Sequence, residues 1–354
     1  MEVIVRDRPI PLFIPEIVGF DKLAPYLKQI DKNQWYSNRG PLVCDFETRI
    51  AAHFNYPQGG VATCASGTLG LISTLLALEL PRGSKCVMPA WTFIGTMAAI
   101  NAAGLEPVLA DVELDSWALD VNEVKKCVEV DKEISAVIVV CPFGKMIDIA
   151  LWEDFSKRYN IAVIIDGAAC FDSFKQVGKK TKLPFIISLH ATKVFGIGEG
   201  GLVFSENTDL INKVKKITNF GIDEQRQVPV VGINGKMSEY HAAVGHALLD
   251  EWHDYRQCWK KLIKSYQRCL GAMSQFSDEY ITTNCILKLD KGEIAKLKRQ
   301  LKGHMEFRCI WQLLDRKCNN ALHLSQTIVS IPFYFNINLS AVNTVLGYIH
   351  EDCK

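Results

Sequence analysis

The chain lacks several patterns that define common classes of protein. Its basic and acidic residues nearly balance, 40 against 39, so the formal net charge is +1. A chain so balanced has no global positive field with which to bind a nucleic-acid backbone. Its longest apolar runs, near residues 134–143 and 161–165, are about half as long as a membrane-spanning helix requires. We therefore expect neither nucleic acid nor a membrane as a partner.

Metal-binding and disulfide patterns are also missing from the sequence. The 12 cysteines occur without a CxxC pair or regular spacing, and there is no HExxH sequence. We therefore expect no zinc or other metal site. The first residues, MEVIVRDRPIPLF, have no basic start followed by an apolar stretch, so no secretory signal is expected. Both features favour reduced thiols and a cytoplasmic location.

Short apolar runs alternate with segments of helical period from about residue 60 onward. The predicted strands are 60–64, 85–89, 107–110, 136–141, 161–166, 185–189 and 201–205. The predicted helices between several of them are 67–80, 93–103, 121–130, 149–159 and 209–218. This alternation predicts an α/β protein whose mostly parallel sheet is covered by helices on both faces.

The two ends of the chain differ from this repeating region. Residues 1–40 carry four prolines and are expected to form an arm and a short helix. Residues 41–240 would form the large α/β domain, and residues 241–354 a smaller α+β domain. Residues 237–271 are expected to form one long helical stretch that is broken or bent somewhere. After it we expect two strands, 282–287 and 327–331, and two helices, 291–302 and 340–349.

Open α/β sheets bind ligands at the carboxyl ends of their strands, so polar residues there are the candidates for a site. Ser66-Gly67-Thr68 opens a predicted helix, where small residues let backbone N–H groups approach an anion, although an ordinary helix cap is an open alternative. Asp166 ends a strand, and a buried carboxylate there needs a partner, catalytic or structural. Lys193 follows another strand, where burial can convert its amine into a nucleophile; a surface lysine is the alternative.

One glycine pattern points away from a common cofactor. Gly196, Gly198 and Gly201 satisfy G-x-G-x-x-G, which in dinucleotide-binding proteins follows a strand and opens a helix. Here the glycines precede a predicted strand instead. The sequence therefore argues against a dinucleotide site, and it contains no Walker A motif.

Taken together, these segments resemble the DegT/DnrJ/EryC1/StrS family of nucleotide-sugar aminotransferases, which depend on pyridoxal 5'-phosphate (PLP). The resemblance is carried by residues 38–41, 46–47, 66–68, 89–93, 166, 188–193, 198–201, 234 and 237–239. It implies the aspartate-aminotransferase-like fold of PLP fold type I. That fold has a mixed, mostly parallel seven-stranded sheet between helices, and a smaller α+β C-terminal domain.

The resemblance also implies roles for individual residues. Lys193 would form the Schiff base with the cofactor aldehyde, and Asp166 would pair with the protonated pyridine nitrogen. Phe93 would stack on the cofactor ring. The cofactor phosphate would be held by three residues at the helix start and a strand end: Gly67, Thr68 and Ser188.

Other positions bear on assembly and on departures from the family pattern. Asn234 matches a residue that reaches the cofactor phosphate of the neighbouring subunit, which implies a homodimer with shared active sites. Ala169 stands where many members have Gln or His, so a polar contact near the ring is lost or replaced. Gly235-Lys236 stands where members have an aromatic-basic pair.

The implied reaction moves an amino group from L-glutamate to a nucleotide-linked 4-keto-6-deoxy sugar. The segment 198–201 looks like that of members that form 4-amino-4,6-dideoxy sugars, and a dTDP sugar is the expected carrier. The product would serve O-antigen, lipopolysaccharide or other surface polysaccharide synthesis. Alternatives are a 3-keto sugar aminotransferase, a dehydratase using pyridoxamine phosphate, and a PLP-binding regulator without turnover. The dehydratases carry histidine in place of the Schiff-base lysine, so Lys193 argues against that alternative.

Overall fold

The computed structural model describes residues 9–271 and 274–337. Its centre is a seven-stranded sheet in the order β1-β8-β7-β6-β5-β2-β4, in which β8 runs antiparallel to both of its neighbours and the other pairs are parallel. The strands are β1 Val61–Cys64, β2 Lys85–Pro89, β4 Glu106–Ala110, β5 Ile134–Val140, β6 Ala162–Asp166, β7 Phe185–Ser188 and β8 Gly201–Phe204. Every predicted strand of this sheet is confirmed.

The strands are apolar throughout because both faces of the sheet are covered. Along β5, Val137 and Val139 pack into the core on one face, whereas Ala136 and Ile138 pack into the core on the other. All four side chains are fully buried. Burial of a valine or isoleucine side chain stabilises the fold by about 1.5–3 kcal/mol. The side chains on both faces of such a strand therefore favour its position inside a sheet covered by helices.

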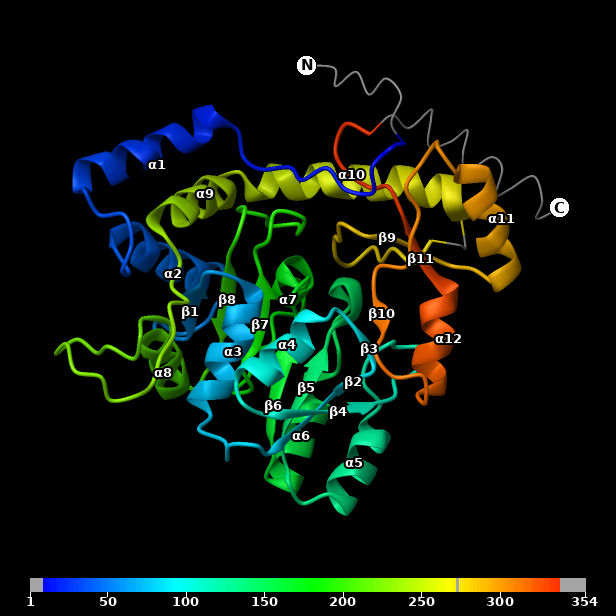
Figure 1. The fold of residues 1–354 in the computed structure, drawn as a ribbon. Coiled ribbons are helices and arrows are strands. Elements are labelled where there is room, and N and C mark those ends of the chain that lie inside the picture. The colour runs from blue at the N-terminus through cyan, green and yellow to red at the C-terminus, as the bar shows by residue number, and fades with distance from the viewer. Residues whose placement is uncertain (1–8, 272–273, 338–354) are drawn as a thin grey trace.

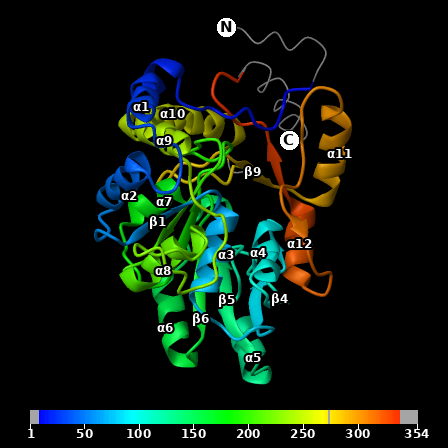
Figure 2. The same ribbon diagram turned by 60° about the vertical axis from the view of Figure 1, so that its left-hand side comes forward.

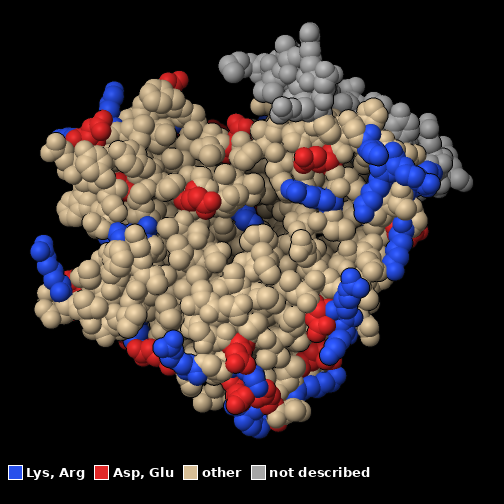
Figure 3. Space-filling model, in the orientation of Figure 1, with Lys and Arg blue, Asp and Glu red and all other residues tan. Residues whose placement is uncertain are grey.

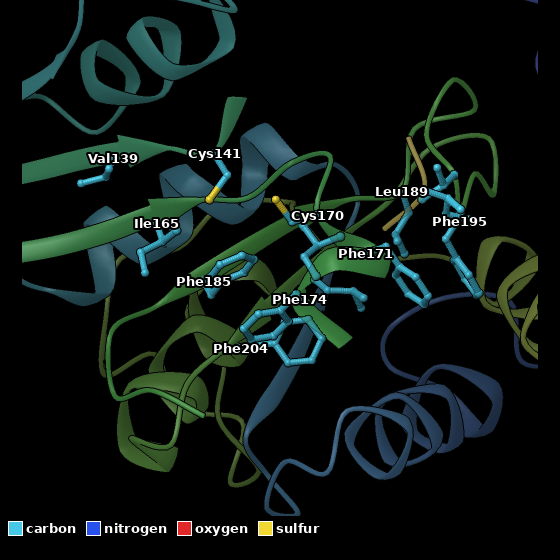
Figure 4. Close-up of a cluster of buried hydrophobic side chains, with 14 of the residues drawn as sticks. Val139, Cys141, Ile165, Cys170, Phe171, Phe174, Phe185, Leu189, Phe195 and Phe204 are labelled. Carbon is cyan, nitrogen blue, oxygen red and sulfur yellow. The ribbon is translucent and has the colours of Figure 1, made fainter. Parts of the chain in front are cut away.

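Helices cover the two faces of the sheet (Figures 1 and 2). One face is covered by α3 Gly67–Ala77, α4 Gly95–Ala102 and α8 Thr208–Thr218. The other is covered by α2 Pro41–His53, α5 Val121–Val130, α6 Ile149–Tyr159 and α7 Phe171–Val177. The second face holds a cluster of aromatic rings, in which Phe174 stacks on Phe185 with centroids 4.0 Å apart (Figure 4).

The N-terminal segment contains more helix than predicted. The expected arm is followed by α1 Phe20–Asn33, which packs on the later helix α9. The arm pairs with the C-terminal part of the chain, since Ile10 forms a bridge with Met305. The helix α2 was not predicted, although Pro41 occupies its first turn, a usual place for proline.

The C-terminal part lies across one end of the sheet. The predicted helical stretch 237–271 is divided at Glu251 into α9 Glu239–Asp250 and α10 Trp252–Leu270. Strand β9 Cys285–Lys288 pairs with β11 Ile328–Ile331, and β10 Gln312–Leu313 pairs with β3 Trp91–Thr92. The remaining elements are the short 3-10 helix η1 Pro142–Gly144 and two helices, α11 Lys291–Leu301 and α12 Asn319–Thr327, of which α12 was not predicted.

One predicted helix and the predicted domain boundaries stay predictions. The helix expected at 340–349 lies outside the described residues. The division into residues 1–40, 41–240 and 241–354 stays a prediction. In the part of the chain that is described, none of the helices has the length and apolar character needed to cross a membrane.

Candidate active site

A pocket of about 410 Å³ opens at the carboxyl ends of the central strands. Six of the seven predicted site residues line it: Gly67, Thr68, Phe93, Asp166, Ser188 and Lys193. The face drawn in Figure 3 is hollowed near its middle, and its charged side chains lie mostly toward the edges. The volume falls in the range of pockets that hold a small cofactor or substrate.

The start of α3 forms one wall of this pocket. Ser66 is the N-cap, and its hydroxyl accepts a hydrogen bond from the Leu69 N–H at 3.1 Å, so the helix-cap interpretation is correct for Ser66. Gly67 lies so close to β7 that an added Cβ would come within 2.9 Å of the Ser188 Cβ. Gly67 and Thr68 line the pocket, and the first N–H groups of a helix have no partner within it. This wall therefore suits an anion such as a phosphate.

Asp166 forms the floor of the pocket at the end of β6. Its carboxylate is buried and accepts two hydrogen bonds, from Thr96 Oγ1 to Oδ2 at 2.9 Å and from the Ala168 N–H to Oδ1 at 3.2 Å. Burial raises the pKa of Asp166, and these two donors and the charge of Lys193 oppose that rise. A buried carboxylate in this position is suited to accept a hydrogen bond from a protonated nitrogen of a ligand.

Lys193 lies on the loop between β7 and β8 and is half-buried in the pocket wall. Its backbone N–H donates to the His190 carbonyl at 2.8 Å, which fixes the loop that carries it. Burial lowers the pKa of Lys193, while the negative charge of Asp166 raises it. A lysine whose pKa is lowered by burial is a candidate nucleophile and proton carrier at neutral pH.

The seventh predicted residue lies elsewhere. Asn234 belongs to the segment between α8 and α9, is exposed, and does not line the pocket. Its Oδ1 accepts a hydrogen bond from Lys236 Nζ at 2.6 Å. The same lysine lies over the Phe220 ring, 4.4 Å from its centroid. Within one chain, therefore, the structure does not bring Asn234 to the other predicted residues.

Several residues that line the pocket were not predicted from the sequence. Phe13 comes from the N-terminal arm, and Trp311 comes from the segment before β10, where its ring stacks on Phe143 with centroids 4.1 Å apart. Thr96 is the donor to Asp166, and Asn284 precedes β9. Thr96 comes soon after the segment 89–93, which carries part of the family resemblance. Its place in the sequence could therefore have indicated it. Phe13 and Trp311 reach the pocket only through tertiary contacts.

The glycine-rich segment at residues 196–201 leads into β8, as predicted. Gly198 has φ +96°, a left-handed conformation that favours glycine, and Gly201 begins a strand. An added Cβ on Gly201 would come within 2.5 Å of the Ser66 carbonyl oxygen, so close strand packing requires this glycine. The segment opens no helix, as a dinucleotide fingerprint would.

Comparison with known proteins identifies relatives of this chain. It is 31% identical to protein Rv3402c of Mycobacterium tuberculosis over a match of 244 residues. The match covers 67% of this chain and 59% of that protein. It is 28% identical over 242 residues to the dTDP-4-amino-4,6-dideoxy-D-glucose transaminase of Shigella dysenteriae, covering 68% and 64% of the two chains. The matches thus span less than two thirds of these relatives' own lengths.

Solved structures and a family model extend the comparison. A Bacillus cereus protein assigned as a PLP-dependent aminotransferase superposes with a TM-score of 0.84 at 27% identity, covering 96% of this chain and 98% of that one. This confirms the predicted aspartate-aminotransferase-like fold. The model of the DegT/DnrJ/EryC1/StrS aminotransferase family matches residues 21–286. The chain belongs to the DegT/DnrJ/EryC1/StrS aminotransferase family.

Proposed function

We propose that this protein is a PLP-dependent aminotransferase that moves an amino group from L-glutamate to a nucleotide-linked 4-keto-6-deoxy sugar. One observation carries the proposal: Lys193 and Asp166, from different strand ends, face the same pocket beside a helix N-terminus. An amine with a lowered pKa, a buried carboxylate and an anion-binding wall are the three protein groups that this chemistry requires.

The residues present fit the cofactor. An added Cβ at Gly67 would meet Ser188, so the absence of a side chain lets the start of α3 pack directly against the end of β7. Gly67, Thr68 and Ser188 therefore line one wall of the pocket at a helix N-terminus, which suits a phosphate. Asp166 is buried and accepts one hydrogen bond at each of its two oxygens, which fixes the carboxylate for contact with a cationic ring nitrogen. Phe93 is 61% exposed in the single chain, so its ring is available to cover a bound aromatic ring.

The residues of the site would have three separate roles: phosphate binding, support of the ring nitrogen and proton transfer. Gly67, Thr68 and Ser188 would bind the phosphate, and Asp166 would hold the proton on the ring nitrogen. When bound, PLP supplies an aldehyde and a ring that accepts electrons. Lys193 would remove the proton from the substrate carbon that carries the amino group and return a proton during the second half of the reaction. Burial lowers the pKa of its amine, which favours the unprotonated form that this role requires.

The identity of the acceptor sugar is supported by the relatives. The Shigella dysenteriae relative is named as a dTDP-4-amino-4,6-dideoxy-D-glucose transaminase. A GDP-perosamine synthase of Escherichia coli O157:H7 is 26% identical over 277 residues, covering 76% of this chain and 74% of that protein. Both support amination of a nucleotide sugar, and we propose dTDP as the carrier and C4 as the site. The product would enter O-antigen or other surface polysaccharide synthesis in the cytoplasm.

A homodimer with shared active sites is part of the proposal. Asn234 is exposed, and the segment around it carries the exposed apolar residues Phe220, Val228 and Val231. Exposed apolar side chains concentrated on one segment are typical of an interaction surface. We propose that this segment reaches the partner subunit and that Asn234 contacts the partner's cofactor phosphate.

The test is an amination assay on the purified, PLP-loaded protein. It would use glutamate with dTDP-, UDP- and GDP-linked 4-keto-6-deoxy sugars and the matching 3-keto sugars, with products identified by NMR. The proposal expects a 4-amino sugar and 2-oxoglutarate in equal amounts. Loss of the sugar hydroxyl without amine transfer would indicate a dehydratase, and PLP binding without any product would indicate a regulator.

A further inference from the structure

Among the described residues, the hydroxyl of Thr96 is the one side chain that donates a hydrogen bond to the buried Asp166 carboxylate. Thr96 lies on α4 and Asp166 at the end of β6, and Thr96 Oγ1 donates to Asp166 Oδ2 at 2.9 Å. Thr96 is 1% exposed and Asp166 is 6% exposed. Because both groups are buried, water cannot readily replace this hydrogen bond if the hydroxyl is removed.

We propose that Thr96 is a positioning residue that holds the Asp166 carboxylate in the orientation required to accept the pyridine N–H of the cofactor. This inference rests on the proposed function. An ionised carboxylate has about four acceptor positions, of which Thr96 and the Ala168 N–H occupy one on each oxygen. The remaining positions are available toward the pocket, and a carboxylate fixed at both oxygens rotates less than one fixed at a single oxygen.

The charges around Asp166 give Thr96 a second effect. Lys193 on the loop after β7 acts on Asp166, and Asp166 acts on the thiol of Cys141 after β5. Cys170 before α7 acts on both Lys193 and Cys141. Burial raises the pKa of Asp166, and the Thr96 hydroxyl is the largest influence that lowers it again. Removal of the hydroxyl therefore favours the protonated carboxyl, which has no negative charge to stabilise the N–H of a cationic ring.

The residue at position 169 makes Asp166 depend more strongly on Thr96. Ala169 lines the pocket next to Ala168 but has no side-chain hydrogen-bonding group. No side chain at that position can compensate for a missing Thr96 hydroxyl. The support for Asp166 thus depends on one hydroxyl and one backbone N–H.

The experiment compares Thr96→Val, which removes the donor with little change of shape, with Thr96→Ser, which keeps it. PLP dissociation constants are measured by absorbance titration, and the pH midpoint of the visible band of the bound cofactor is recorded. We expect Thr96→Val to bind PLP about tenfold more weakly, as loss of a hydrogen bond to a charged group predicts. We expect its pH midpoint to move upward by about one unit, because a positive charge at the ring nitrogen is lost. Thr96→Ser should restore both values.

Controls separate this role from simple destabilisation. Thr327→Val removes another buried hydroxyl, which donates to the His323 carbonyl at 2.9 Å, and should leave both measurements unchanged. Thr96→Ala tests the same prediction if the valine variant does not fold. Wild-type values for affinity and pH midpoint in the variants without the hydroxyl would overturn the inference and leave the proposed function intact. Failure of the wild type to bind PLP would overturn both.

Discussion

At the scale of single residues, the environment of Lys193 determines what its amine can do. Burial lowers its pKa, and the nearby Asp166 and Cys170 oppose this effect. We predict that Lys193→Ala loses turnover by at least about 1000-fold, because the proton carrier at the reacting carbon is removed. Steady-state assays with glutamate and the preferred keto sugar measure this loss.

A matched control accompanies this prediction. Lys180→Ala removes an exposed lysine and should retain wild-type turnover. The Lys193→Ala protein should also unfold at a temperature close to that of the wild type. Substantial turnover in Lys193→Ala would assign proton transfer to another group.

His53 provides a prediction about pH and stability. It ends α2 beside the rings of Phe54 and Phe171, and its Nε2 has no hydrogen-bond partner. Burial, helped by the positive charge of Lys175, lowers the pKa of His53 to about 4 from an ordinary 6.5. Because the unfolded chain then binds more protons, stability is lost as the pH falls from 6.5 toward 4, by about 3 kcal/mol.

Denaturant unfolding at a series of pH values measures this loss. In His53→Gln, which cannot titrate, the free energy of unfolding should fall less between pH 6.5 and 4 than in the wild type. The exposed His253→Gln variant should follow the wild type. Parallel curves for His53→Gln and the wild type would show that His53 does not control this transition.

Some residues of the site could be predicted from sequence, and others could not. Asp166 ends β6, while Lys193 and Gly67 lie shortly after β7 and β1, and the carboxyl ends of parallel strands meet at one edge of the sheet. Phe13 and Trp311 lie in the N-terminal arm and beside β10, far from those strands in sequence. Their contribution depends on how the C-terminal part packs on the sheet, which no local pattern encodes.

At the scale of elements, Glu47 connects α2 with β1 and α8. Its buried carboxylate accepts hydrogen bonds from Arg39 at 2.7 and 3.0 Å and from the Thr63 N–H at 2.9 Å, and it lies 2.8 Å from Lys215 Nζ. Burial favours its protonated form, but the charges of Arg39 and Lys215 outweigh burial and lower the pKa of Glu47.

We predict that Glu47→Gln lowers the free energy of unfolding by about 3–5 kcal/mol, because two cations lose their partner in a buried site. Equilibrium urea unfolding measures the change. Glu79→Gln is the control, since Glu79 pairs with Lys213 at the surface and exposed pairs contribute little. Equal stabilities for the two variants would mean that the Glu47 cluster is not a structural connection.

The start of α3 gives a prediction about both packing and cofactor binding. An added Cβ at Gly67 would lie 2.9 Å from the Ser188 Cβ. We expect Gly67→Ala to cost about 1–3 kcal/mol of stability through overpacking and to weaken PLP binding. Gly19→Ala serves as the control, because an added Cβ there meets no atom within 4 Å. Wild-type PLP affinity in Gly67→Ala would exclude this wall from the cofactor site.

The strands were predictable because burial on both faces produces continuous apolar runs, as in β5 and β6. Helix boundaries depended on more specific contacts. The break at Glu251 lies in the stretch 237–271, for which the sequence predicts a break or bend but not its position. The seven residues of α7 are too few to show a helical period, and its position follows from packing of Phe171 and Phe174 in the core.

At the scale of the whole molecule, the exposed apolar residues between α8 and α9 predict self-association. Val231 is 89% exposed and Val228 is 64% exposed in the single chain. We expect the wild type to have the mass of two chains by light scattering, and the Val228→Lys/Val231→Lys variant to shift toward the mass of one. Val130→Lys, at a site 86% exposed at the end of α5, is the control and should stay dimeric. A monomeric wild type would contradict the shared-site proposal.

The most direct test of the whole account is chemical. PLP-loaded protein is reduced with borohydride and digested, and the labelled peptide is identified by mass spectrometry. The account predicts a single cofactor-derived mass increase on the peptide that contains Lys193, lost in Lys193→Ala. A label on another lysine, or no label on protein that has bound PLP, would contradict it.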